Sequence, residues 1–203
     1  MGFENDDVGM PRPRARLDHA AIAAAFAPDG LHGVRADEVA RRAGVAKPTL
    51  YAHGRSKEAV FLACVEAEAE RLLARLYDAD VGTRELGVAS RAAALARAVI
   101  EHAAAHPEAA RLLHVTARHA TSAVASDVDA TLDRVPARIA EALRRDLEDE
   151  RAETVATMLH GAAVALALRP PPNPAGAAAM LGQALAAVVE PAGREEHVTL
   201  GFY

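Results

Sequence analysis

Residues 39–58 read VARRAGVAKPTLYAHGRSKE, and this stretch decides the fold. A short helix is favoured over Ala36–Arg42, and Gly44 ends it because glycine readily adopts the left-handed backbone of a helix stop. A second short helix follows over Ala46–Ala52. Pro48 lies in its first turn, where the missing N–H costs little. Helix, glycine turn and short helix together predict a helix-turn-helix.

The sequence on either side of this motif predicts one helix before it and a long helix after it. Upstream, apolar residues recur at helical spacing over residues 17–26, and the turn residues 28–30 end that helix. Downstream, Ser56 suits the N-cap of a long helix with a periodic apolar face. We therefore expect a three-helix head over residues 14–57, preceded by a disordered tail over residues 1–13.

Turn and proline signals divide the rest of the chain into five more helices. The breaks fall at residues 82–83, 106–107, 121–127, 149 and 169–174. Pro136 lies inside the third of these helices, where it either kinks the helix or marks its start. The last two helices, about Glu150–Leu168 and Ala175–Val189, are apolar on most faces and need burial on more than one side. The chain is thus predicted to be all-α, with about nine helices.

Composition agrees with helical packing and separates a basic head from an acidic body. Hydrophobic residues make up 51% of the 203 residues but aromatic residues only 3%, so smaller aliphatic side chains must fill the core. Residues 10–57 hold nine Lys or Arg against four acidic residues, a net charge of +5. Residues 58–203 hold 14 basic against 21 acidic residues, a net charge of −7, and acidic clusters such as residues 146–150 indicate solvated faces. This asymmetry is typical of a phosphate-binding module joined to a domain that does not bind nucleic acid.

Several classes of function find no support in the sequence. Cys64 is the only cysteine, which excludes an internal disulfide and a cysteine-based zinc site and is compatible with a reducing cytoplasm. Charged residues interrupt every long apolar stretch, so we expect a cytoplasmic protein with no membrane partner. No catalytic motif occurs, so we expect neither an enzyme nor catalytic residues. His102 and His106 have the spacing of a metal pair, but Pro107 weakens that helix end, and we expect neither a metal nor a cofactor.

The second short helix has the side chains that reading DNA requires. A helix that enters the major groove needs slim polar residues on its exposed face and apolar residues behind. Lys47 reaches a guanine edge or a phosphate, the Thr49 methyl group meets a thymine, and the Tyr51 hydroxyl reaches a phosphate. Val45 and Leu50 provide the apolar side. This pattern predicts binding to double-stranded DNA.

The same stretch resembles the DNA-binding head of the TetR family of repressors. The shared elements are the turn Ala43-Gly44-Val45, the recognition helix Lys47–Tyr51, His53 and the helix opening Ser56-Lys57-Glu58. The resemblance implies that Lys57, at a helix N-terminus, binds a phosphate together with free backbone N–H groups. It also implies a DNA-backbone contact for His53. Arg35, just before the motif's first helix, is a further candidate for a phosphate contact.

Three positions depart from the family's usual pattern. Val34 stands where the family usually has a capping threonine, so the next helix begins from Arg35 or Asp37 with a poorer cap, at a cost of about 1 kcal/mol. Ala46 replaces a common serine, which removes one possible phosphate contact. Gly54 replaces the family's usual aromatic residue, which anchors the recognition helix to the long helix that follows it. The head is then either looser than usual or packed differently by Phe26 and Phe61.

The resemblance also implies a homodimer. Residues 58–203 would form the effector-binding and dimerisation domain, whose last two helices pair with those of a second copy. Apolar residues such as Leu159, Met180 and Leu185 on these helices supply surplus surface for a partner. Two heads about 34 Å apart would then read successive major grooves of a palindromic operator.

The function implied is a repressor that a small-molecule effector releases from its operator. We expect a small, largely apolar effector among the fourth to seventh helices, with His102 and His114 as its polar contacts. Its binding would tilt the long helix and spoil the spacing of the two heads. Two alternatives remain open. The first is a DNA-binding regulator that needs no ligand, and the second is a helical ligand-binding or enzymatic module with a degenerate head.

Overall fold

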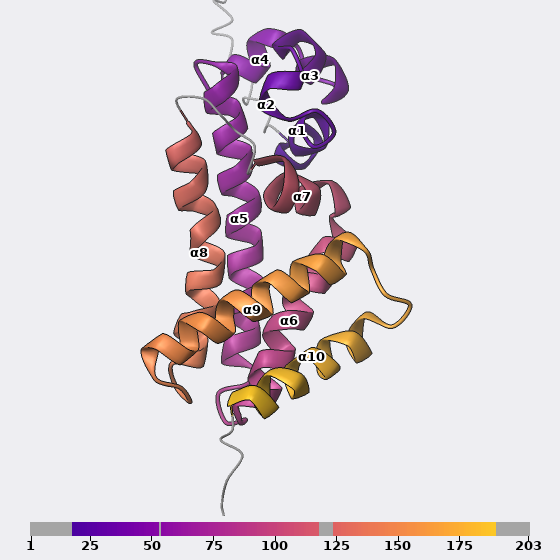
Figure 1. Ribbon diagram of the computed structural model, residues 1–203. Coiled ribbons are helices and arrows are strands. Elements are labelled where there is room, and N and C mark those ends of the chain that lie inside the picture. The colour runs from indigo at the N-terminus through magenta and orange to yellow at the C-terminus, as the bar shows by residue number, and fades with distance from the viewer. Residues whose placement is uncertain (1–17, 53, 118–123, 190–203) are drawn as a thin grey trace, which may run out of the picture.

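The computed structural model describes residues 18–52, 54–117 and 124–189, and over these ranges the protein is all-α, as predicted. Ten α-helices and one π-helical segment follow one another, with no strand in the described part (Figure 1). A small head lies at one end of the long helix α5 (Lys57–Val81), and the remaining helices form a body along it. No helix of the described residues is long and apolar enough to span a membrane.

The head contains four helices rather than the three expected. They are α1 (His19–Phe26), α2 (Gly30–Gly33), α3 (Ala36–Arg42) and α4 (Lys47–Tyr51). The extra helix is α2, a single turn that the sequence presents as a turn between two glycines. Gly30 begins it with a φ of +70°, a backbone conformation that favours glycine. Leu31 within it is buried in the core, so tertiary packing stabilises this turn.

Capping and aromatic packing join the head to α5. Asp18 caps α1 by accepting hydrogen bonds from the backbone N–H groups of Ala20 and Ala21. Ser56 caps α5 as predicted, because its Oγ accepts from the N–H of Ala59 at 3.1 Å. The rings of Phe26 and Phe61, both fully buried, meet edge to face with centroids 5.1 Å apart. The head is thus packed onto the long helix by this pair.

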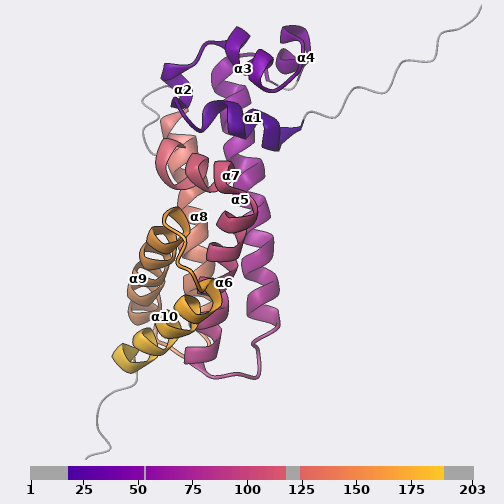
Figure 2. The same ribbon diagram turned by 90° about the vertical axis from the view of Figure 1, so that its right-hand side faces the viewer.

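The body has the five further helical segments expected. They are α6 (Val88–Ala105), α7 (Pro107–Arg111) continued by the π-helical η1 (Leu112–Thr116), α8 (Ala125–Leu143), α9 (Asp149–Leu168) and α10 (Pro174–Val189). Pro136 lies inside α8, so it does not mark the start of that helix. Helix α6 is central and packs against α5, α9 and α10 (Figure 2). The approach of α10 is close, since a Cβ on Gly182 would lie 2.5 Å from the Cβ of Ala93.

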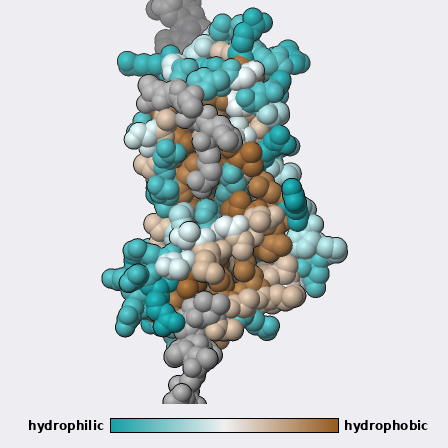
Figure 3. All heavy atoms as spheres, in the orientation of Figure 1, coloured by the Kyte–Doolittle hydropathy of each residue, from teal (hydrophilic) through white to brown (hydrophobic). Residues whose placement is uncertain are grey.

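Two of the apolar residues expected to face a partner copy are instead buried within the protomer. Leu159 on α9 is fully buried and Leu185 on α10 is 4% exposed, because both helices pack against α6. That part of the dimer prediction is wrong for these two side chains. Among the described side chains of α9 and α10, the large apolar residues that remain open are Met158, Leu168 and Met180, at 47%, 41% and 72% exposed. Apolar side chains gather over α9 and α10 in Figure 3.

A buried ionic cluster ties the far ends of α5, α6 and α8 together. Asp80, 2% exposed, accepts from Arg138 Nη2 at 2.6 Å and from Arg145 Nη1 at 2.7 Å. Arg91, 1% exposed, lies 3.9 Å from Asp80 and also pairs with Asp146. One Arg91 nitrogen donates to the carbonyls of the loop between α5 and α6 at residues 83, 84 and 86. The cluster therefore fixes both the loop and the neighbouring helices.

Candidate nucleic-acid interface

The helix-turn-helix is built by α3, a glycine turn and α4. Gly44 has a φ of +66°, which closes the turn, and no described residue other than its chain neighbours comes within 4 Å of where its Cβ would be. The N–H of Val45 donates to the carbonyl of Ala40 at 3.0 Å and fixes the angle between the two helices. Pro48 lies in the first turn of α4, as predicted. The predicted recognition helix is therefore present as α4, which has five residues, or about one and a half turns.

Helix α4 presents a polar side to solvent and an apolar side to the core. Lys47 is exposed, Thr49 and Tyr51 are half-buried, and Leu50 is fully buried. Lys47 Nζ forms an ion pair with Asp37 of α3 at 2.7 Å. The hydrogen bond from Lys47 lowers the pKa of the Asp37 carboxyl group, and the same bond raises the pKa of Lys47. The DNA contacts of Lys47, Thr49 and Tyr51 stay predictions.

Lys57 has a structural role that the sequence did not indicate. Its Nζ donates to the carbonyls of Leu31 at 2.6 Å and Val34 at 3.0 Å. These carbonyls lie at the end of α2, where helix carbonyls lack partners within the helix. A lysine ammonium has three donors, so one remains for a phosphate. The phosphate contact of Lys57 is compatible with this geometry and stays a prediction.

Replacing Lys57 separates these two roles. We expect Lys57→Ala to weaken binding to all DNA sequences alike and to flatten the dependence of log affinity on log salt by about one unit. Lys57→Gln keeps an uncharged donor for the α2 carbonyls and should flatten the slope equally while losing less thermal stability. The salt slope is measured by fluorescence anisotropy. An unchanged slope in both variants would mean that Lys57 does not contact a phosphate.

Of the two remaining candidate residues, Arg35 and His53, the structure describes only Arg35. Arg35 is exposed and is the N-cap of α3 without a side-chain hydrogen bond, which agrees with the poor cap expected there. His53 lies outside the described residues. Sequence reasoning missed Arg41, which is exposed and next to the turn, and Arg42, which donates to the carbonyl of Ala25. Both arginines also bind Glu38, and these hydrogen bonds lower the pKa of that carboxyl group to about 2.

The departure at Gly54 is explained by close packing. A Cβ at this position would lie 2.8 Å from the backbone nitrogen of Val60 and 2.9 Å from its Cγ2 atom. A side chain at residue 54 therefore finds no room against the first turn of α5. The pair Phe26 and Phe61 fills the head instead, which favours the second of the two expectations for this head, a different packing.

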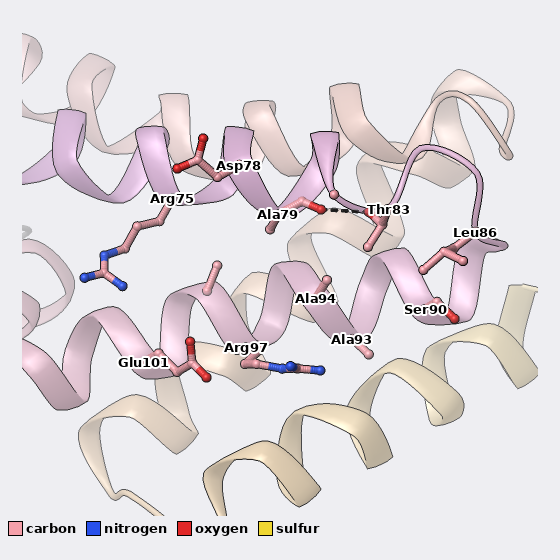
Figure 4. A pocket seen from close by; sticks show the side chains of 12 residues that line it. Arg75, Asp78, Ala79, Thr83, Leu86, Ser90, Ala93, Ala94, Arg97 and Glu101 are labelled. Atoms are coloured by element: carbon pink, nitrogen blue, oxygen red, sulfur yellow. Dashed lines mark hydrogen bonds between the residues drawn. The ribbon is translucent and has the colours of Figure 1, made fainter.

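The body offers a cleft, but not at the two histidines predicted to bind an effector. A cleft of about 640 Å³ runs between α5 and α6 (Figure 4). Its floor is lined by small residues such as Ala79 and Ala94, and charged residues lie along its rim. His102 is fully buried and His114 is 9% exposed, and neither lines this cleft. Their direct contact with an effector stays a prediction.

The environment of the two histidines is nevertheless unusual for a hydrophobic core. Burial, together with the smaller electrostatic effects of His106, Arg75 and Arg71, lowers the pKa of His102 to about 4. His114 lies in the π-helical segment η1, and its ring centroid is 5.6 Å from that of His160 on α9. In the described residues, no three His, Cys, Asp or Glu side chains lie close enough together to hold a metal ion.

Comparison with known proteins places this geometry among transcriptional regulators. Residues 20–64 match the family described as bacterial regulatory proteins, tetR family. A TetR-like transcriptional regulator from Rhodococcus sp. RHA1 is 27% identical, covering 87% of this chain and 96% of that chain, with a TM-score of 0.65. The fatty acid degradation regulator FadR from Bacillus halodurans is 17% identical, covering 83% and 96% of the two chains, with a TM-score of 0.68. FadR from Bacillus subtilis, solved in complex with stearoyl-CoA, is 14% identical, covering 82% and 95%, also with a TM-score of 0.68.

Proposed function

We propose that this chain, which belongs to the TetR family of transcriptional regulators, is a cytoplasmic, homodimeric repressor that a small-molecule effector releases from its operator. The observation that carries the proposal is the helix-turn-helix itself. Helix α4 presents Lys47 to solvent beside Thr49 and Tyr51, while Leu50 anchors the helix in the core. Arg35 and Lys57 flank this surface and suit phosphate contacts.

The cleft between α5 and α6 supports an effector site. Its volume of about 640 Å³ lies within the range of small-molecule pockets, which disfavours a regulator that needs no ligand. One protein with this fold, FadR from Bacillus subtilis, was solved in complex with stearoyl-CoA. Helix α5 begins directly after the recognition helix and also forms one wall of the cleft. A ligand that widens the cleft would therefore move the head.

A second contact joins the body to the head. The carbonyl of Ala27, at the end of α1, accepts from Thr116 Oγ1 at 2.7 Å and from Arg111 Nε at 3.2 Å. These donors belong to η1 and α7, which pack against α1. A displacement of η1 within the body would thus reach α1 and, through it, α3. We infer that release of DNA uses both this contact and α5.

The proposal is tested by capture of DNA fragments from a genomic library with the purified full-length protein. We expect enrichment of a palindromic site whose half-sites are about one helical turn, or 34 Å, apart, or a multiple of that. Competition with bulk DNA at physiological salt is the control for non-specific binding. Sequences captured without any common motif would overturn the proposal.

The dimer interface is tested at Met180 on α10, which is 72% exposed. We expect Met180→Arg to yield monomers that no longer bind a palindromic site, because a charge would enter the apolar contact of α10 with its partner. Val81→Arg is the matched control, since Val81 is 40% exposed on α5, away from α9 and α10. Light scattering gives the mass of each variant. A monomeric wild-type protein at micromolar concentration would refute the dimer.

A further inference from the structure

The interior next to the cleft contains two buried side chains with unpartnered polar atoms. Glu68 of α5 is fully buried, and its Oε1 accepts from Arg71 at 2.6 Å, while Oε2 has no hydrogen-bond partner among the described residues. His102 of α6 is also fully buried, and neither ring nitrogen has a hydrogen-bond partner in the described part of the chain. Its ring lies against that of His106, with centroids 5.4 Å apart. Buried polar groups without partners are costly and rare in folded proteins, and they often mark where another molecule binds.

Both side chains continue the helix faces that line the cleft. On α6, Ala98 lines the cleft and His102 follows four residues later, on the same face. On α5, Arg75 lines the cleft, and Glu68 lies seven residues earlier, again on the same face. Figure 4 shows Arg75 and Glu101 at one end of the cleft. Helical spacing therefore places Glu68 and His102 past that end of the cleft, on the two helices that form its walls.

The chemistry of the two groups selects among ligands. The lowered pKa of His102, about 4, means that its imidazole is neutral at physiological pH and offers one donor and one acceptor. A carboxylate such as that of Glu68 offers only acceptors. A hydroxyl group donates its one hydrogen to Glu68 and accepts from the imidazole N–H of His102, and an amino group has enough donors for both residues. A carboxylate on the ligand would instead lie against the carboxylate of Glu68 and repel it. A hydrocarbon chain satisfies neither residue.

We propose that the effector of this repressor carries a hydroxyl or amino group that enters through the α5–α6 cleft and hydrogen-bonds to Glu68 and His102. The release of DNA by this ligand rests on the proposed function, whereas the binding of the ligand to Glu68 and His102 does not. Glu68 and His102 select the ligand, and the small residues of the cleft admit a slender one. The site therefore prefers a hydrogen-bond donor over a fatty acid or a purely apolar molecule.

The test uses four probes of similar size with the full-length protein: 2-phenylethanol, 2-phenylethylamine, 3-phenylpropionate and ethylbenzene. Binding is measured by thermal shift and by the NMR signals of the His102 ring. We expect the alcohol or the amine to bind with a Kd at least about tenfold lower than the other two probes and to shift the His102 signals. Equal binding of ethylbenzene, preferential binding of 3-phenylpropionate, or no binding by the alcohol and the amine at millimolar concentration would overturn the proposal.

Two variants assign the selectivity to the named residues. Glu68→Gln should remove the tighter binding of the amine, and His102→Leu should remove the tighter binding of the alcohol. His102→Leu should leave the protein folded, because it removes a buried polar group that has no hydrogen-bond partner among the described residues. Glu66→Gln, at an exposed position of α5 that does not line the cleft, is the control and should change neither preference. Unaltered selectivity in both variants contradicts the assignment. If a probe binds at His102 but does not release captured DNA, the binding site is confirmed and only the proposal that its ligand releases DNA is contradicted.

Discussion

Asp80→Asn is expected to lower the free energy of unfolding by about 3–5 kcal/mol, the cost of removing one partner from a buried ion pair. The carboxylate of Asp80 accepts from Arg138 and Arg145, and Arg91 lies 3.9 Å away. Arg91 is 1% exposed, so the substitution leaves its positive charge in the core with less compensation. The new side chain has nearly the same volume, so the loss reports electrostatics rather than a cavity.

Urea denaturation measures this loss, and Glu70→Gln provides the control. Glu70 pairs with Arg134 at 2.5 Å, but the two side chains are 59% and 49% exposed. Exposed pairs contribute about 0–1 kcal/mol, so the control should be close to wild type. If Asp80→Asn proves no more destabilising than Glu70→Gln, the ionic cluster does not hold the ends of α5, α6 and α8 together.

The second large effect is expected on DNA binding. The triple variant Lys47→Met, Thr49→Ala and Tyr51→Phe should bind a captured operator no better than random DNA, a loss of about 10³-fold or more. Each residue lies on the open side of α4, and a base contact is worth about 1–3 kcal/mol. The phenylalanine keeps the ring of the half-buried Tyr51 and so preserves the packing of the head.

Fluorescence anisotropy at one fixed salt concentration measures this effect, with circular dichroism to confirm that the head remains folded. Arg84→Met is the control for loss of a positive charge, since Arg84 is exposed in the loop after α5. It should bind as the wild type does. If the triple variant binds the operator as tightly as the wild type does, α4 is not part of the surface that recognises DNA.

Local signals in the sequence were sufficient to predict the helices of the head that have their own stops and caps. Gly44 ends α3, Pro48 starts α4 and Ser56 caps α5, and each acts within a few residues of its position. Helix α2 was missed because a single turn between Gly30 and Gly33 has no helical period of its own. Its stability comes from burial of a leucine and from a lysine 26 residues further along the chain.

Long-range packing decided what the sequence could not predict. Asp80 and Arg91 are at least 55 residues away from their partners Arg138, Arg145 and Asp146, and each reads as a solvated charge until α5, α6 and α8 are brought together. For the same reason the apolar Leu159 and Leu185 were expected at a dimer interface, whereas α6 buries them. Periodicity indicates that a helix face is apolar, but not whether its own chain or a partner covers it.

A crystal structure of the protein with its captured operator tests most directly whether α4 reads DNA. We expect α4 in the major groove, with Lys47 and Thr49 at base edges, and with Tyr51 and Lys57 at phosphates of each half-site. We also expect the ion pair of Lys47 with Asp37 to open or turn to admit the DNA. A complex in which α4 points away from the groove, while another surface holds the DNA, would show that α4 is not the recognition helix.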